Sequence, residues 1–336
     1  MRRETARRVG REPHGSSDDP DVLDFSANTN PRTPDGVEAV YRDAFERSRS
    51  YPAEPPTAFR EAAAEYVDCA PERVVPTPGG LAAIRLTVAL TVGEGDSALV
   101  PAPSFAEYAR EVRLRGGEPT FVPQDEILDA DPSGHALAVV CTPNNPTGNA
   151  SDPDALAAFA ARCRGAGTPL LVDEAFLGFT DLPSLAGTEG VVVARSLTKL
   201  FGLPGIRTGF AVATGELLEA LRAARRPWNV SAPALATGAF CMERDDFVAA
   251  TRERVRTERE RLRATLAERF AVHPSRAPFL LLDVGDRDVE AVLARSRDSG
   301  IALRDATTFR DLDSHVRVAV RLAEENDRLL EALSDV

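Results

Sequence analysis

Short apolar runs rich in β-branched residues alternate with helical patterns between about residues 73 and 215. One helical pattern covers residues 152–164, with Ser151 expected as its N-cap and Pro153 in its first turn. This alternation predicts an α/β layer built on a mostly parallel sheet that helices flank. The predicted strands are residues 73–76, 97–101, 120–122, 137–141, 170–172, 191–194 and 209–213.

The pattern changes at residue 245, where a long charged segment carries apolar residues at helical spacing as far as residue 269. Strand-like and helical patterns follow it, at residues 279–284, 289–299, 301–304 and 316–320, with a final helix from Ala323. We therefore expect a large α/β domain over residues 36–240. A smaller α+β domain would combine residues 241–336 with an N-terminal arm, residues 1–35.

Polar motifs follow five of the predicted strands. In a doubly wound sheet, the carboxyl ends of the strands meet along one edge, and ligands bind there. Five motifs at five strand ends therefore predict one assembled site. The motifs are T-P-G-G (77–80), P-A-P-S-F (101–105), T-P-N-N-P-T-G (142–148), D-E-A-F (173–176) and S-L-T-K (196–199).

Composition adds one anomaly. The net charge is −12, yet 39 of the 40 basic residues are arginine, and Lys199 is the only lysine. An acidic, lysine-poor surface would stay soluble at high salt, which suggests adaptation to a salty cytoplasm, and it argues against nucleic-acid binding. Biased genomic base composition is an alternative explanation for the replacement of lysine by arginine. Either pressure should have removed Lys199 as well, so its presence indicates a task that arginine cannot perform.

Lys199 ends an apolar strand, where partial desolvation would lower the pKa of its amine and suit it to form a Schiff base with pyridoxal phosphate (PLP). Asp173 directly follows another apolar strand, and its carboxylate could pair with the cofactor's protonated pyridine nitrogen. An ATPase with a Walker-B aspartate is the rival reading. It is disfavoured because Leu200, not Ser or Thr, follows the lysine.

A phosphate could bind where Gly79, Gly80 and Leu81 open a helical segment, since backbone N–H groups at a helix start attract anions. Two glycines also make a plain turn. Ser196 and Arg207 strengthen the phosphate reading, because a hydroxyl and a guanidinium match phosphate geometry.

Two further residues have both a cofactor reading and a structural one. Tyr108 could stack on the pyridine face or be a core aromatic, and Asn145 could donate to the ring's phenolic oxygen or simply form a turn.

The four cysteines and four histidines show no metal-ligand spacing, so we expect no metal site. No apolar run has the length of a membrane helix. We expect the arginine-rich N-terminus, residues 1–11, to be a frayed tail, and the protein to be cytoplasmic.

Together these residues resemble fold type I PLP-dependent enzymes of the aspartate aminotransferase superfamily, in order from His14 to about Leu333. The most specific element is S-L-T-K-L-F-G-L-P-G-I-R-T-G-F (196–210). The resemblance implies a homodimer with shared active sites, in which Tyr51 reaches the partner's cofactor phosphate. It also implies the following contacts with PLP: Lys199 in the Schiff base, Asp173 at the pyridine nitrogen, Asn145 at the phenolic oxygen, Tyr108 on the ring, Ser196 and Arg207 on the phosphate, and Thr198 beside them.

Within the superfamily the chain looks most like the threonine-phosphate decarboxylases of cobalamin biosynthesis, which are close kin of the histidinol-phosphate aminotransferases. The similarities are His14-Gly15, D-F-S-A-N-T-N-P (24–31), Phe176 in D-E-A-F, and V-R-V-A-V-R (316–321). They imply a small phosphorylated amino acid as substrate. Arg317 would hold its carboxylate, Arg304 and His14 would lie near its phosphate, and Asn30 would also contact the substrate.

Two positions depart from the family pattern. Leu81 stands where a hydroxyl residue usually touches the cofactor phosphate, and Ser16 replaces the second glycine of an H-G-G opening. Decarboxylation and transamination differ in which bond at the substrate's Cα breaks, and that depends on positioning at the ångström scale. The sequence therefore leaves an aminotransferase open as the alternative to a decarboxylase.

Overall fold

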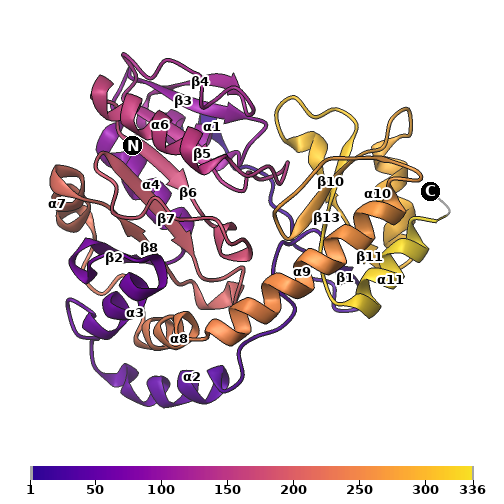
Figure 1. The fold of residues 1–336 in the computed structure, drawn as a ribbon, viewed down its shortest axis with the longest axis horizontal. Coiled ribbons are helices and arrows are strands. Elements are labelled where there is room, and N and C mark those ends of the chain that lie inside the picture. The colour runs from indigo at the N-terminus through magenta and orange to yellow at the C-terminus, as the bar shows by residue number, and fades with distance from the viewer. Residues whose placement is uncertain (1–2, 335–336) are drawn as a thin grey trace.

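The computed structural model describes residues 3–334, and its larger part is a seven-stranded sheet with helices on both faces (Figure 1). The strand order is β2-β8-β7-β6-β5-β3-β4, with β8 antiparallel to its two neighbours and the other pairs parallel. The mostly parallel sheet and all seven predicted strands are confirmed. The strands are β2 (Val74–Thr77), β3 (Ser97–Ala102), β4 (Glu118–Pro123), β5 (Leu137–Cys141), β6 (Leu170–Asp173), β7 (Val191–Ser196) and β8 (Gly209–Val212).

Both faces of this sheet are buried, because alternate strand residues enter two different cores. Leu170 and Val172 of β6 pack in the core that contains α3, α6 and α8, whereas Leu171 packs in the core that contains α4, α5 and α7. Near-continuous apolar strands are typical of parallel sheets covered on both sides. The helices of this part are α2 (Val37–Glu46), α3 (Thr57–Val67), α4 (Gly80–Thr91), α5 (Glu107–Arg115), α6 (Pro153–Ala166), α7 (Gly215–Ala224) and α8 (Ala232–Met242).

The long helix α9 (Asp245–Leu266) leads to the smaller part, a four-stranded antiparallel sheet in the order β12-β13-β10-β9. The predicted single strand over residues 301–304 is wrong. It is two short strands, because the chain changes partner at Leu303, and a continuous buried run cannot reveal such a change. The remaining elements are β9 (Ala271–Val272), β10 (Phe279–Asp283), α10 (Val289–Asp298), β11 (Ile301–Ala302), β12 (Arg304–Asp305), β13 (His315–Ala319) and α11 (Ala323–Ala332).

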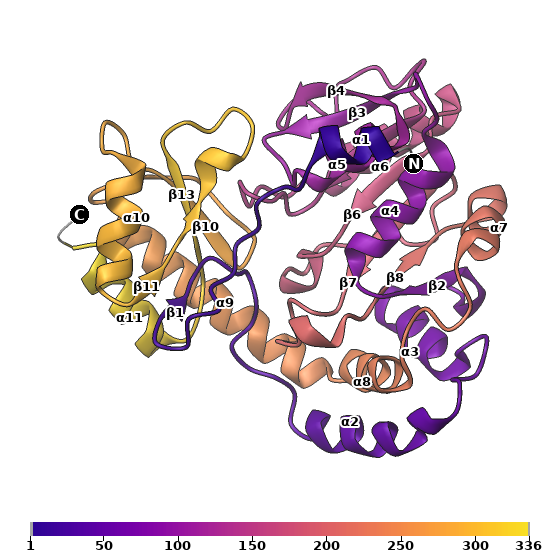
Figure 2. The same ribbon diagram turned by 180° about the vertical axis from the view of Figure 1, so that it is seen from behind.

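The N-terminal arm contacts both parts (Figure 2). Residues Arg3–Val9 form helix α1 against α5, where the Arg110 Nε donates to the Gly10 carbonyl at 2.9 Å. The expectation of a frayed tail is wrong for this segment. Further along, β1 (Leu23–Asp24) pairs with β11 of the smaller part. The domain boundaries expected from the sequence stay a prediction.

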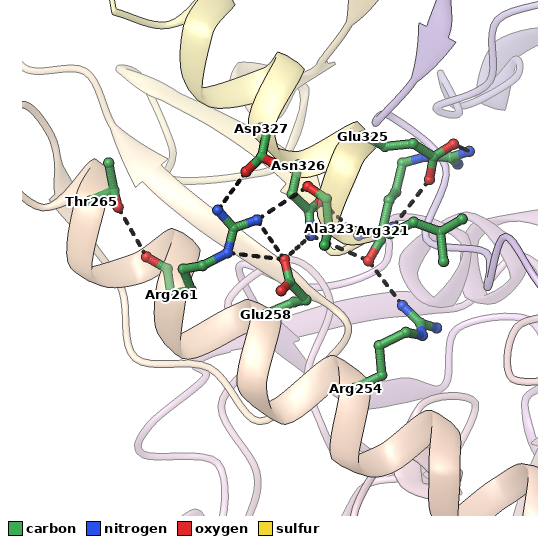
Figure 3. Close-up of polar contacts among 10 residues, drawn as sticks. Arg254, Glu258, Arg261, Thr265, Arg321, Ala323, Glu325, Asn326 and Asp327 are labelled. Atoms are coloured by element: carbon green, nitrogen blue, oxygen red, sulfur yellow. Dashed lines mark hydrogen bonds and ion pairs between the residues drawn. The ribbon is translucent and has the colours of Figure 1, made fainter.

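A polar network joins α9 to α11 (Figure 3). The buried Glu258 carboxylate accepts hydrogen bonds from Arg261 at 2.7 Å and from Asn326 at 2.8 Å, and Arg261 also contacts Asp327 at 2.6 Å. One helical turn away, the Arg254 guanidinium donates to the Asn30 side chain at 2.8 Å. This network connects α9 of the smaller part to Asn30, whose N–H donates to the Lys199 carbonyl.

The start of α6 gives a test of local structure. Its N-cap is Asp152 and not Ser151, since the Asp152 carboxylate accepts from the N–H groups of Asp154 and Ala155. We expect Asp152→Ala to lower the free energy of unfolding by about 1 kcal/mol, measured by urea denaturation. Ser151→Ala, the matched control, should change it by less than about 0.5 kcal/mol; equal losses from both variants would contradict this assignment.

Candidate active site

A cavity of about 350 Å³ lies at the carboxyl ends of the large sheet's strands, against β12, β13 and the N-terminal arm. Most of the site residues expected from the sequence line it, and they come from segments as far apart in the chain as His14 and Arg317. The expected residues that line it are His14, Gly80, Leu81, Tyr108, Asn145, Asp173, Ser196, Thr198, Lys199, Arg207, Arg304 and Arg317.

Lys199 follows β7 and reaches the cavity wall. Its pKa is lowered to about 8, first by burial and then by the positive charges of Arg317 and Arg207, whereas the Asp173 carboxylate acts in the opposite direction. An amine with this pKa is partly neutral near pH 8, which is the state that attacks a carbonyl carbon. The environment therefore suits Lys199 to form a covalent bond with an aldehyde.

Asp173 ends β6, lines the cavity and is almost completely buried. Its Oδ2 accepts a hydrogen bond from the Tyr108 hydroxyl at 2.5 Å, and its Oδ1 accepts one from the Ala175 N–H at 3.0 Å. Burial raises the pKa of this carboxyl above its usual value, while the two hydrogen bonds act to lower it. A carboxylate held in this way can pair with a protonated ring nitrogen.

One corner of the cavity is shaped for a phosphate. Gly79 has φ of +89° and lies so close to Arg207 that a Cβ would stand 2.9 Å from the Arg207 Nη2 atom. Gly79 itself is not among the residues that line the cavity. At Gly80, a Cβ would stand 3.2 Å from that of Ser196, whose hydroxyl lies 2.9 Å from the Thr198 hydroxyl. A helix start, two hydroxyls and a guanidinium form a donor set for a dianion.

Two arginines occupy another side of the cavity. Arg304 of β12 and Arg317 of β13 are opposite partners in the antiparallel pair, and both are buried. Within residues 3–334 neither forms an ion pair: Arg304 donates to Pro13 O and Thr308 Oγ1, each at 2.8 Å, and Arg317 donates to Ser26 O at 2.8 Å and to the Asn145 Oδ1. Burial and the Arg304 charge lower the pKa of Arg317 to about 9.

The N-terminal arm reaches the cavity at His14 and Gly15. The His14 Nε2 lies 3.3 Å from the Glu107 carboxylate. Gly15 passes so close to the segment that follows β1 that a Cβ would stand 2.5 Å from the Ser26 carbonyl oxygen and 2.9 Å from the Arg304 Cδ. The His-Gly pair thus needs its glycine for close approach, and His14 lies beside the phosphate subsite expected at Arg304.

Besides Gly79, two expected residues are absent from the cavity lining, Asn30 and Tyr51. The Asn30 side chain instead donates to the Leu200 carbonyl at 2.8 Å, and its N–H donates to the Lys199 carbonyl at 2.9 Å. Its expected contact with the substrate stays a prediction. Tyr51 is 78% exposed and stacks on Trp228 at 4.4 Å between ring centroids. Its expected role concerns a second subunit and stays a prediction.

The sequence reading missed some of the lining, above all Asn28. Asn28 is buried, and its Oδ1 has no hydrogen-bond partner within the described chain. The motif D-F-S-A-N-T-N-P contains both asparagines, and an i, i+2 spacing places both on one face of an extended segment, so the pattern could not separate them. Phe105, Phe176 and Phe309 also line the cavity and make its apolar walls.

Other kinds of site receive no support from the residues that the structure describes. Over residues 3–334 there is no group of three or more histidine, cysteine, aspartate or glutamate side chains that could hold a metal ion. The four cysteines are unpaired. No helix in the same range is long and apolar enough to cross a membrane.

Comparisons with known proteins agree with this geometry. Residues 20–333 match the model of the family "Aminotransferase class I and II". The chain is 32% identical over 338 residues to a threonine-phosphate decarboxylase of Salmonella typhimurium (94% of this chain, 91% of the relative). It is 30% identical over 325 residues to histidinol-phosphate aminotransferase 1 of Archaeoglobus fulgidus (94% and 99%).

A solved structure gives the same result. The L-threonine-O-3-phosphate decarboxylase from Porphyromonas gingivalis superposes with a TM-score of 0.83 at 25% identity, covering 93% of this chain and 98% of that one. The fold expected from the sequence and the resemblance on which it rested are thereby confirmed. The chain belongs to the class I and II aminotransferase family, whose members are pyridoxal-phosphate-dependent enzymes.

Proposed function

We propose that this enzyme decarboxylates L-threonine O-3-phosphate to (R)-1-aminopropan-2-ol O-2-phosphate, a step of cobalamin biosynthesis. The observation that carries the proposal is the pair Arg304 and Arg317, two buried guanidiniums without ion-pair partners in the described chain, side by side on the cavity wall. Two buried cations that lack carboxylate partners are costly, and a ligand with two anionic groups relieves that cost.

The spacing of the two arginines favours a short substrate. They are direct partners across β12 and β13, so their Cα atoms are about 5 Å apart. Threonine phosphate carries its carboxylate and its phosphate on adjacent carbons, which suits neighbouring guanidiniums. Histidinol phosphate carries no carboxylate, and its amine-bearing carbon instead carries an imidazolylmethyl group, for which these two arginines offer no partner.

The cavity residues fit the family's cofactor. Lys199 would hold PLP covalently, Asp173 would pair with the pyridine nitrogen, and the corner at Arg207 would take the phosphate. Because the Asn145 Oδ1 accepts from Arg317, its amide N–H₂ is left to donate to the phenolic oxygen. When bound, the cofactor supplies a ring that accepts electrons from a bond at the substrate's Cα.

The side chains around the substrate would then decide which bond breaks. Arg317 would hold the carboxylate and Arg304, with His14, the phosphate, so that the Cα–carboxylate bond is fixed in direction. Loss of CO₂ removes the negative charge that Arg317 had bound. Lys199 would return a proton to Cα, a task for which its pKa of about 8 is suitable.

The proposal extends to the location and the assembly of the enzyme. We place the enzyme in the cytoplasm as a homodimer in which the exposed Tyr51 reaches the partner's cofactor phosphate. The net charge of −12 with a single lysine supports adaptation to high salt.

Product analysis tests the activity directly. Purified enzyme with PLP and threonine phosphate in high salt should release CO₂ in amounts equal to the amino-alcohol phosphate formed. Histidinol phosphate with 2-oxoglutarate should yield no glutamate. Glutamate formation without release of CO₂ would contradict the proposed decarboxylase activity and identify an aminotransferase. That alternative is supported by the similarity to histidinol-phosphate aminotransferases.

A variant pair tests the phosphate subsite in the same assay. Arg304→Met should raise KM for threonine phosphate by about tenfold to a hundredfold, because a charge-assisted bond is lost. Arg310→Met, the matched control, removes an exposed guanidinium that lies over Phe121 and does not line the cavity. An equal change in both variants would contradict the assignment of Arg304.

The depressed pKa of Lys199 predicts a pH dependence for attachment of the cofactor. Below pH 8 the amine is protonated and cannot attack the aldehyde, and above pH 8 it is neutral. The rate at which apoenzyme gains the absorption of covalently bound PLP should therefore rise to a plateau with a midpoint near pH 8, not near 10.5. Lys199→Arg keeps a cation but should show no attachment at any pH; attachment in that variant would refute the assignment.

A further inference from the structure

Tyr108 makes a contact that its expected stacking role does not explain. The residue lies on α5, is fully buried, and its hydroxyl donates to the Asp173 Oδ2 at 2.5 Å. A tyrosine that only stacked on a ring would need no hydroxyl, and phenylalanine would serve equally well. The position of the oxygen therefore indicates a second task for this side chain.

Asp173 needs help to stay ionised at this depth. Burial favours its neutral form, and the Glu174 carboxylate beside it acts in the same direction. The Tyr108 hydroxyl, the Ala175 N–H and the charge of Lys199 act the other way. Among these, Tyr108 and Ala175 contact the carboxylate directly, and only the tyrosine does so through a side chain.

The hydroxyl is fixed as a donor. Burial and the neighbouring Asp173 raise the pKa of Tyr108 well above its usual value, so the phenol keeps its proton. The Cys141 thiol, opposite Asp173 on the next strand, also stays protonated because burial raises its pKa. Of these two groups, only the Tyr108 hydroxyl donates to the Asp173 carboxylate, since the thiol donates to the Pro143 carbonyl at 3.4 Å.

We propose that the Tyr108 hydroxyl is a positioning group that keeps Asp173 ionised and directed at the pyridine nitrogen of the cofactor. With the hydroxyl present, the negative charge stays on Asp173 and the proton on the ring nitrogen. Without it, the carboxyl competes for that proton, and the ring becomes a weaker electron acceptor. The inference rests on the family's cofactor and not on the decarboxylation proposed above, so cofactor binding tests it alone.

The test compares two cofactors in one variant. Tyr108→Phe keeps the ring and removes one oxygen atom. The dissociation constant is measured by equilibrium dialysis for PLP and for the analogue in which C–H replaces the ring nitrogen. We expect the variant to bind PLP about tenfold more weakly or worse, because a hydrogen bond to a charged group is lost. Binding of the analogue should change by less than about twofold, since Asp173 has no ring proton to share with it.

A matched control removes a tyrosine hydroxyl elsewhere. Tyr66 lies near Gly178 and does not line the cavity, so Tyr66→Phe should leave both dissociation constants unchanged. Equal weakening of both cofactors in Tyr108→Phe would overturn the proposal, because it would mean that the hydroxyl acts through packing. Unchanged binding of PLP would overturn it too.

A second measurement covers the case in which the variant is unstable. In the Asp173→Asn background, where no carboxylate remains, adding Tyr108→Phe should cause no further loss of PLP affinity. An additional tenfold loss in that background would also overturn the proposal, because the hydroxyl would then act independently of Asp173.

Discussion

The cavity is unbalanced in charge, and the other features of the site depend on this. Lys199, Arg207, Arg304 and Arg317 line it, and Asp173 is the only carboxylate among its lining residues within the described chain. This occurs in a protein with a net charge of −12. Two of these cations, Arg304 and Arg317, are buried without ion-pair partners in the described chain, and anionic ligands relieve the cost of burying them. In the proposed function, a cofactor phosphate and a doubly anionic substrate would supply the missing negative charge. Burial first, and then the charges of neighbouring arginines, lower the pKa values of Lys199 and Arg317.

The fold concentrates these charges by close backbone packing. Parallel strands β5, β6 and β7 deliver Asp173 and Lys199 to one edge of the sheet, while the antiparallel β12–β13 pair delivers the two arginines from the smaller part. Glycine permits the contacts: a Cβ at Gly209 would stand 2.4 Å from the Arg195 carbonyl oxygen, and one at Gly15 would meet the Ser26 carbonyl. The charged groups therefore cannot separate without disruption of the main chain.

Sequence reasoning predicted what depends on local pattern. The seven strands follow from apolar β-branched runs, and the gathering of Asp173, Ser196 and Lys199 follows from the geometry of parallel strand ends. It failed where two neighbouring residues satisfy the same rule: Ser151 and Asp152 are both good N-caps, and only the latter caps α6. The hydrogen bond between Tyr108 and Asp173, 65 residues apart, depends on how α5 packs against β6, which no local pattern encodes.

The most direct test of the charge argument is a crystal structure of the holoenzyme with an unreactive phosphonate analogue of threonine phosphate. Our account predicts the phosphonate at Arg304 and the carboxylate at Arg317, with the cofactor phosphate at Arg207. A complex in which the phosphonate contacts neither Arg304 nor Arg317, or in which the cofactor phosphate occupies that pair, would contradict it.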